Sequence, residues 1–146
     1  MKKLLAVTAM AAMLFLAMLV MTGTAFAQQC VDNGDGTVTD KASRLVWQKE
    51  TAGPMDWHGA VSYAQGRQQG GYADWRLPTR QELTGLFNSP CKDALSVLED
   101  PYWSSTTETN PYSGLVAWLV HFRDGQSNRI WTGYAVYYAR GVRTAR

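Results

Sequence analysis

The stretch Gly70–Leu83, GGYADWRLPTRQEL, places an extended segment directly before the start of a helix. Pro78 disfavours a helical backbone at Leu77, so the letters DWRLP are expected to be extended. Thr79 and Glu82 have the spacing of a capping box, in which each side chain bonds a free N–H group at the start of the helix. The stretch therefore predicts a strand-like segment that turns at once into a helix.

The charged residues of this stretch have a structural explanation. Asp74 and Arg76 are two residues apart on an extended segment, so we expect them to point to the same side and to bond each other or nearby backbone. The helix that follows has an apolar face and is predicted to stop at Ser89-Pro90; the face consists of Leu83, Leu86 and Phe87. Nothing here requires a substrate, and we interpret the stretch as architecture.

A second helix is predicted upstream of this stretch. Asp56 is a good N-cap, and apolar residues follow it at helical spacing on one face: Trp57, Ala60, Val61 and Ala64. Gly70-Gly71 is expected to end this helix. His58 lies on it, and a single histidine on a helix surface is more often solvated than catalytic.

The rest of the chain is expected to be rich in β-strands. Asn33-Gly34 and Asp35-Gly36 are turn signals, and Arg123–Gln126 contains an Asp-Gly turn. Strands are predicted at Thr37–Thr39, Arg44–Gln48, Tyr102–Glu108 and Leu115–Phe122, with one or two more between residues 128 and 143. Leu115–Phe122 is apolar on both faces, which is typical of a central strand. These elements predict an α+β domain in which two helices pack on a mainly antiparallel sheet.

The N-terminal residues have the pattern of an export signal. Lys2 and Lys3 precede an uncharged, mostly apolar run, and Ala25 and Ala27 form the small-x-small ending that signal peptidase recognises. We expect residues 1–27 to be a signal peptide and residues 28–146 to form one domain, exported to the periplasm or the cell surface without stable membrane insertion. An uncleaved N-terminal anchor is the rival reading, because the apolar run is long enough to span a bilayer.

The cysteines and charges fit an exported domain. Cys30 and Cys91 are the two cysteines of the chain, and an even count in an exported protein favours a disulfide between them. Without Lys2 and Lys3 the fourteen basic residues become twelve, which balances the twelve acidic ones and lends no support to a nucleic-acid partner. The C-terminal part is locally basic, either as a face for an anionic ligand or as solvated or salt-bridged strand ends; its arginines are Arg123, Arg129, Arg140, Arg143 and Arg146.

Catalytic, metal and cofactor motifs are missing from the sequence. A calcium loop starting at Asp32 would have Gly34 and Gly36 at liganding positions, so a hairpin is the better interpretation. His58 and His121 are far apart and have no zinc-site spacing. There is no nucleophile elbow, phosphate loop or dinucleotide fingerprint. We therefore expect no enzyme activity, no metal and no cofactor, although scattered catalytic residues would escape this reasoning.

Aromatic residues are the positive signal for binding. The chain has six tryptophans and seven tyrosines, and those near its end stand among Gly, Thr, Asn and Arg. Aromatic side chains in such surroundings are typical of faces that bind sugars or proteins, although alternate strand positions would also send some of them into the core. The predicted ligand-binding residues are Asn128, Arg129, Trp131, Tyr134 and Tyr137, with Glu108, Asn110 and Tyr112 as further candidates.

Seven segments together resemble the Lcl C-terminal domain family, a bacterial family formerly classed as a domain of unknown function. In chain order they are DNGDGTVTD, RLVWQK, MDWHGAVSYA, GGYADWRLPTRQEL, YWSST, AWLVHFRDG and RGVR. The resemblance implies a C-type lectin-like fold, with two helices, a twisted antiparallel sheet and a long loop region. It also implies that the motif residues are scaffold: Asp74, Trp75, Arg76, Leu77, Pro78, Thr79, Glu82, Trp103, Ser104 and Ser105.

For function, the resemblance implies a binding role. The adhesin that gives the family its name binds sulfated glycosaminoglycans, but the present chain lacks the collagen-like repeat of that protein. Glu108-Thr109-Asn110-Pro111 only echoes one calcium-binding triplet of the wider lectin fold, and the second triplet is missing. We expect an adhesin-like module that recognises a glycan, an anionic polysaccharide or a protein. The alternatives are a structural component of an envelope complex with an obligate protein partner, and an enzyme without recognisable motifs.

Overall fold

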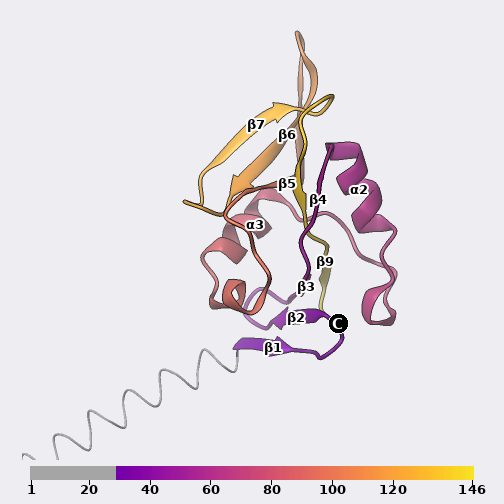
Figure 1. Ribbon diagram of the computed structural model, residues 1–146, viewed down its shortest axis with the longest axis vertical. Coiled ribbons are helices and arrows are strands. Elements are labelled where there is room, and N and C mark those ends of the chain that lie inside the picture. The colour runs from indigo at the N-terminus through magenta and orange to yellow at the C-terminus, as the bar shows by residue number, and fades with distance from the viewer. Residues whose placement is uncertain (1–28) are drawn as a thin grey trace, which may run out of the picture.

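The computed structural model describes residues 29–146, which form an α+β domain (Figure 1). The predicted signal peptide lies outside the described residues. Two α-helices, α2 (Trp57–Gln65) and α3 (Arg80–Phe87), are each followed by a short 3-10 helix, η1 (Gln69–Gly71) and η2 (Pro90–Ala94). The strands are β1 (Cys30–Asp32), β2 (Thr37–Asp40), β3 (Leu45–Gln48), β4 (Ala52–Met55), β5 (Pro101–Asn110), β6 (Gly114–His121), β7 (Ser127–Trp131), β8 (Tyr137–Ala139) and β9 (Val142–Thr144).

The strands form two sheets in place of the single sheet predicted. The smaller sheet has the order β1-β2-β3-β9 and is antiparallel throughout. The larger sheet has the order β4-β8-β5-β6-β7, and its β5–β8 pair is parallel. β6 lies between β5 and β7, as the sequence predicted for a central strand, and its two apolar faces are covered by two different core clusters, one around Val120 and the other around Ala117 and Leu119. The end of the chain contributes three strands, β7, β8 and β9, where one or two were expected.

Local sequence explains both helices. The Asp56 side chain accepts a hydrogen bond from the Gly59 N–H at 2.6 Å and caps α2. The predicted end of this helix at Gly70-Gly71 is wrong, because Gly66 already closes the last turn through its N–H to the Ser62 carbonyl at 2.9 Å. The capping box of α3 is confirmed: the Thr79 hydroxyl accepts from the Glu82 N–H and the Glu82 carboxylate accepts from the Thr79 N–H.

The DWRLP segment lies alongside β9, the edge strand of the smaller sheet. Arg76 forms a β-bridge with Val142, and its guanidinium makes two hydrogen bonds to the Glu82 carboxylate, at 2.7 and 2.8 Å. Asp74 and Arg76 do not bond each other, and of the two predicted alternatives Arg76 makes the bond to nearby backbone, to the Leu77 carbonyl at 3.4 Å. Asp74 instead accepts from Arg143 at 2.7 Å, because the bridge places β9 alongside the segment.

The second motif, WSST, is tied to the first. The Ser105 N–H donates to the Pro78 carbonyl at 2.7 Å, and the buried Ser104 hydroxyl donates to the Trp118 carbonyl at 2.8 Å. Trp103 is fully buried, and its indole N–H donates to the Met55 carbonyl at 2.8 Å. These bonds join β5 to the segment before α3, to β6 and to β4, so the two motifs hold the larger sheet and the helices together.

The core consists of two apolar clusters on opposite faces of the larger sheet. One lies between α3, the smaller sheet and the sheet face that carries Tyr102 and Val120. The other lies under α2, around Trp103 and Leu119. The predicted disulfide is confirmed, and it joins Cys30 of β1 to Cys91 of η2 beside the first cluster. Within residues 29–146, no helix has both the length and the apolar character needed to cross a bilayer.

Candidate functional site

The predicted binding residues are spread over β5, β6, β7 and the loops that follow β5 and β7. The register places Glu108, Val116 and Trp131 side by side across β5, β6 and β7, and Trp118 opposite Arg129. Residues that pair across strands, or that are two apart on one strand, share a face of a sheet. Glu108, Trp118, Arg129 and Trp131 therefore lie on one face, and the start of α3 covers its inner part.

Four of the side chains on this face form a connected polar network: Arg80, Glu108, Trp118 and Arg129. The Arg129 guanidinium donates to one Glu108 oxygen at 2.5 Å, and the Trp118 indole N–H donates to the other at 3.0 Å. The Arg80 guanidinium lies over the Trp118 ring, 4.1 Å from its centroid. The hydrogen bond from Trp118 and the Arg129 guanidinium lower the pKa of the Glu108 carboxyl, so the acid stays ionised near neutral pH.

Exposed apolar side chains lie on the same end of the larger sheet as this network, on the β5–β6 hairpin and on β7 and the loop after it; Tyr112, Trp131, Tyr134 and Val136 are here called the aromatic patch. Tyr112 is 98% exposed at the tip of the β5–β6 hairpin, and Tyr134 is 85% exposed in the loop after β7. Trp131 and Tyr134 are in edge-to-face contact, with ring centroids 5.0 Å apart. Such a group of exposed aromatic side chains is a candidate interaction surface, because it keeps apolar area in contact with water.

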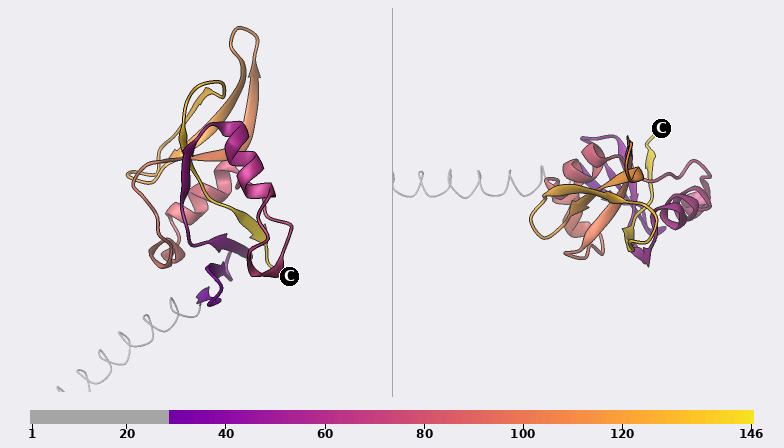
Figure 2. Two further views of the ribbon diagram at one scale, coloured as in Figure 1. Left: turned by 45° about the vertical axis from the view of Figure 1, so that its right-hand side comes forward. Right: turned by 90° about the horizontal axis from the view of Figure 1, so that it is seen from above.

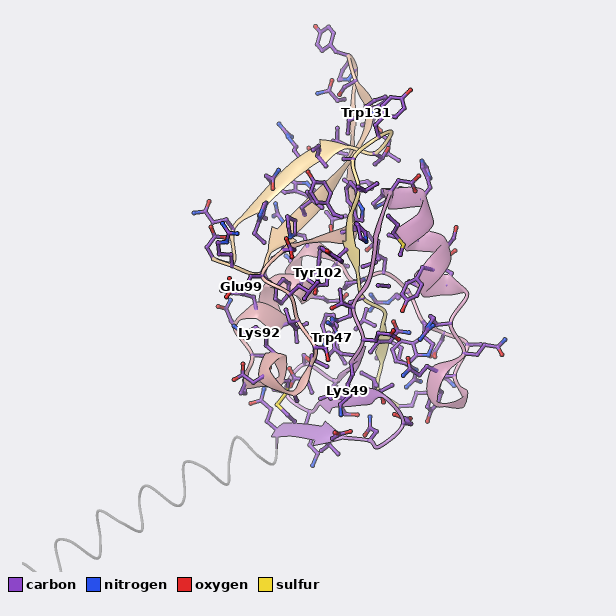
Figure 3. The ribbon with its side chains drawn as sticks, viewed as in Figure 1. Trp47, Lys49, Lys92, Glu99, Tyr102 and Trp131 are labelled. Carbon is purple, nitrogen blue, oxygen red and sulfur yellow. A yellow bond between two sulfur atoms is a disulfide. The ribbon has the colours of Figure 1, made fainter. Side chains whose placement is uncertain are left out.

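The patch is at the end of the molecule farthest from the smaller sheet. Two views show the β5–β6 hairpin projecting beyond the rest of the domain (Figures 1 and 2). Trp131 lies at this end, whereas Trp47 and Tyr102 lie in the interior (Figure 3). Gly133 lets the Trp131 ring pack against the loop, since a Cβ at position 133 would lie 2.6 Å from it.

Asn110 supports the hairpin that carries Tyr112. Its side-chain oxygen accepts the N–H groups of Tyr112 and Ser113, at 2.8 and 3.2 Å, and so closes the turn. The residues that resemble a calcium-binding triplet therefore bond other parts of the protein: Asn110 bonds the backbone of the hairpin turn, and Glu108 bonds Arg129 and Trp118.

Two of the predicted binding residues lie apart from the patch. Asn128 is on the opposite face of β7, where its side chain bonds the His121 ring at 2.5 Å. Tyr137 is half-buried, and its ring packs edge-on against Trp103 in the core under α2. Successive residues of a strand point to opposite faces, which separates Asn128 from Arg129.

The arginines near the C-terminus do not form one basic face. Arg140 and Arg143 are buried, and both Arg143 and Arg146 pair with Asp74. Arg129 pairs with Glu108, as described above. Of the two interpretations of this basic region, the ion pairs of Arg129, Arg143 and Arg146 agree with salt-bridged strand ends, because folding distributes these charges among separate partners.

A separate hollow of about 810 Å³ lies between α3 and the smaller sheet. Its charged members already have partners: Asp40 accepts from Gln29 and Ser89, and Glu82 accepts from Arg76. Trp47 is among the residues that line the hollow, and its buried indole N–H has no hydrogen-bond partner among the described residues. Within the described part of the chain, no group of three or more His, Cys, Asp or Glu residues is placed to hold a metal ion.

Sequence reasoning missed two members of the polar network. Trp118 stands in a run that is apolar on both faces, which is typical of a buried central strand, yet the side chain is only half-buried. Arg80 is the first residue of α3, and only the packing of that helix on β6 brings it over Trp118. The sequence signal that was available is the alternation of Val116, Trp118 and Val120, which shows that the three share a face.

The comparisons agree with the resemblance seen in the motifs. The profile of a family described as the Lcl C-terminal domain matches residues 36–143, most of the chain. The match begins at the turn before β2 and ends in β9, so it includes both helices, the polar network and the aromatic patch. No curated protein matches the chain.

Proposed function

The chain belongs to the Lcl C-terminal domain family, and on that premise we propose that it is an exported, non-enzymatic binding module of C-type lectin-like fold. Its ligand is a glycan at the cell envelope or surface, and the aromatic patch is the binding site. The observation that carries this proposal is the exposure of Tyr112, Trp131 and Tyr134 beside a preorganised polar network.

The chemistry of the patch suits a sugar ring. An aromatic face stacks on the C–H groups of a pyranose, while nearby charged groups bond its hydroxyls. Trp131 and Tyr134 are held in one arrangement by their mutual contact and by the fit of the indole over Gly133. Such preorganisation reduces the ordering entropy lost on binding, which favours affinity at a small site.

The charges favour a neutral or weakly anionic glycan over a densely sulfated one. The network contains two guanidinium groups, but Glu108 neutralises that of Arg129. A polyanion would need several free cations in a row, and its binding would weaken steeply with salt. Stacking on Trp131 depends little on salt, so we expect binding that persists when the ionic strength is raised.

The proposal also makes binding independent of calcium. Glu108 and Asn110, the residues that echo a calcium-binding triplet, already bond Arg129, Trp118 and the hairpin turn. A calcium ion would have to displace these partners. The module is therefore expected to bind its glycan equally well with calcium and with a chelator.

A glycan array with the purified protein tests the proposal. We expect binding to a subset of neutral or weakly anionic glycans, and a loss of about ten-fold or more in affinity for Trp131→Ala, because a stacked aromatic is an anchor of small sites. Leu98→Ala is the matched control, since Leu98 is 41% exposed and Trp131 43% exposed, and Leu98 lies in a different loop. Equal binding by parent and Trp131→Ala would exclude the patch as the site.

The alternative is a structural component of an envelope complex. The same exposed rings, Tyr112 and Tyr134 above all, would then insert into a protein partner. This alternative would replace the glycan hypothesis if the protein bound no glycan on the array, and if one envelope protein co-purified with the parent but not with Trp131→Ala.

A further inference from the structure

Strand β7 has an open backbone edge. It is the last strand of the larger sheet and pairs with β6 alone. Two hydrogen bonds bracket the ladder: the His121 N–H donates to the Gln126 carbonyl at 2.8 Å, and the Thr132 N–H to the Leu115 carbonyl at 3.2 Å. In an antiparallel ladder the bonded pairs alternate, so Asn128 and Ile130 direct their backbone groups to β6.

The backbone groups of Ser127, Arg129 and Trp131 consequently point away from the sheet. Among residues 29–146, nothing accepts a hydrogen bond from their N–H groups. All three residues are exposed. This edge therefore offers three N–H and three C=O groups to another extended chain.

The other edges of the two sheets are closed or short. Pro54 interrupts β4, and its pairing with β8 is irregular. The outer side of β9 is covered by the bridge from Arg76 to Val142, and β1 has three residues. Proteins commonly guard such edges with an outward charge, a proline or a bulge. On β7 the exposed Arg129 side chain is held along the sheet by its ion pair with Glu108, and the strand contains no proline and no bulge.

We propose that β7 is a self-association strand that pairs antiparallel with β7 of a second copy, about a two-fold axis at Ile130. This register places Arg129 opposite Trp131 of the other copy and Ile130 beside its own counterpart. A register centred on Arg129 would bring two arginines together, and one centred on Asn128 would bring two amides together. Among these three registers, charge and apolar contact favour Ile130 as the centre.

The pairing would join two sheets into one and place both copies' Trp131 side chains on the same face. If the proposed glycan site is correct, the dimer presents two patches to one polysaccharide, which raises avidity without any new contact. Self-association itself does not depend on the glycan, so it is measured without one. A strand of this length makes a small interface, and we expect a weak dimer.

Sedimentation velocity on the purified protein, over concentrations on the order of micromolar to millimolar, measures this dimer. Arg129→Pro removes an outward N–H from each copy but leaves the bonds between β7 and β6, so we expect its dissociation constant to rise by about ten-fold or more. Arg129→Ala is the matched control, because it loses the same ion pair with Glu108 but keeps the N–H. It should still dimerise. Dimers of equal strength from both variants would place the interface elsewhere and overturn the proposal.

Cysteine crosslinking tests the register and does not rely on the proline variant folding. Both native cysteines are in the disulfide, so one introduced thiol is unique. Ile130→Cys is expected to form a covalent dimer under mild oxidation, since the two positions face each other at the axis. Asn128→Cys should not, because it would face Thr132 of the other copy. A parent that is monomeric at every concentration, or crosslinking of Asn128→Cys but not of Ile130→Cys, would overturn the inference.

Discussion

Arg140 carries a positive charge inside the core, where its partners are neutral oxygens. Its guanidinium donates to the carbonyls of Gln48, Lys49 and Ser96 and to the Thr51 hydroxyl. Burial lowers the pKa of Arg140, but an arginine starts so high that the group stays charged. The side chain thereby ties the end of β3 and the segment before β5 to the end of β8.

Removal of this side chain should be costly. We expect Arg140→Met to lower the free energy of unfolding by about 3 kcal/mol, because it leaves several buried carbonyls without a donor. Urea denaturation measures the change. The control is Arg123→Met at an exposed position, for which a change within about 0.5 kcal/mol is expected. Equal stability of the two variants would show that water replaces the lost donors.

The Glu82 carboxylate makes stability depend on pH. Burial raises the pKa of Glu82, but the hydrogen bonds from Arg76 and from the Thr79 N–H outweigh burial and leave that pKa below its usual value. A lowered folded pKa means that the ionised carboxylate stabilises the fold above the unfolded pKa of about 4.3 and that this stability is lost as pH falls.

The difference in melting temperature between the parent and Glu82→Gln should therefore be large at pH 6 and shrink below about pH 4.3. Thermal unfolding followed by circular dichroism over this range measures it. Glu99→Gln changes an exposed carboxylate and should differ little from the parent at any pH. If the difference in melting temperature between the parent and Glu82→Gln stayed constant across this pH range, the destabilisation would not come from the loss of the carboxylate charge.

At the scale of elements, two turns between neighbouring strands depend on a glycine with a left-handed backbone. Gly125 turns the chain between β6 and β7 with φ of 76°, and Gly34 turns it between β1 and β2 with φ of 75°. The two positions share a left-handed backbone but not the same surroundings. A Cβ on Gly125 would lie 2.5 Å from the Phe87 ring at the end of α3, whereas Gly34 has no neighbour within 4 Å.

These two glycines separate backbone strain from packing. We expect Gly34→Ala to lower the free energy of unfolding by about 1 kcal/mol, because alanine is strained in a left-handed backbone conformation and its Cβ would meet no neighbour. Gly125→Ala should cost at least about 1 kcal/mol more, because the Phe87 ring must also move. Chemical denaturation of the two variants measures the difference. If the two variants lost similar amounts of stability, the β6–β7 turn would be able to shift and accommodate the Cβ without displacing Phe87 of α3.

For the whole molecule, the first and last strands of the described chain meet in one small sheet. β9 pairs with β3, and β1 is attached at the other edge through β2. The disulfide then joins β1 to η2, closing a loop with a sequence separation of 61 residues. This end is the base of the domain, and the aromatic patch is at the opposite end. The base can therefore be reinforced without restricting the side chains of the aromatic patch.

Loss of the disulfide should destabilise the whole domain. The chain-entropy model gives about 4 kcal/mol for a loop of this length. Denaturation with and without a reductant measures the loss, and a Cys30→Ala, Cys91→Ala variant should be equally unstable in both conditions. A loss well below 1 kcal/mol would show that β1 contributes little to the cooperative unit.

The sequence by itself determined the features that depend on neighbours along the chain. The capping box of α3, the Asp56 cap, the turns and the central strand β6 follow from residues within a few positions of each other, and a hydrogen bond or a steric limit over that distance is nearly the same in every fold. The cysteine count also sufficed for the disulfide, because the chain contains a single possible pair. The family was recognisable for a related reason: its motifs are compact and stand in a fixed order.

Only the tertiary structure decided which distant groups meet. It divided the strands between two sheets, paired Asp74 with Arg143 instead of Arg76, and buried Arg140 and Arg143, two arginines of the basic C-terminal region. It also separated Asn128 and Tyr137 from the patch and brought Arg80 over Trp118. Each of these outcomes depends on strand register and on helix packing. A charged side chain pairs with whichever opposite charge the folded backbone brings near it. The local sequence is compatible with many such pairings, so it does not determine which one forms.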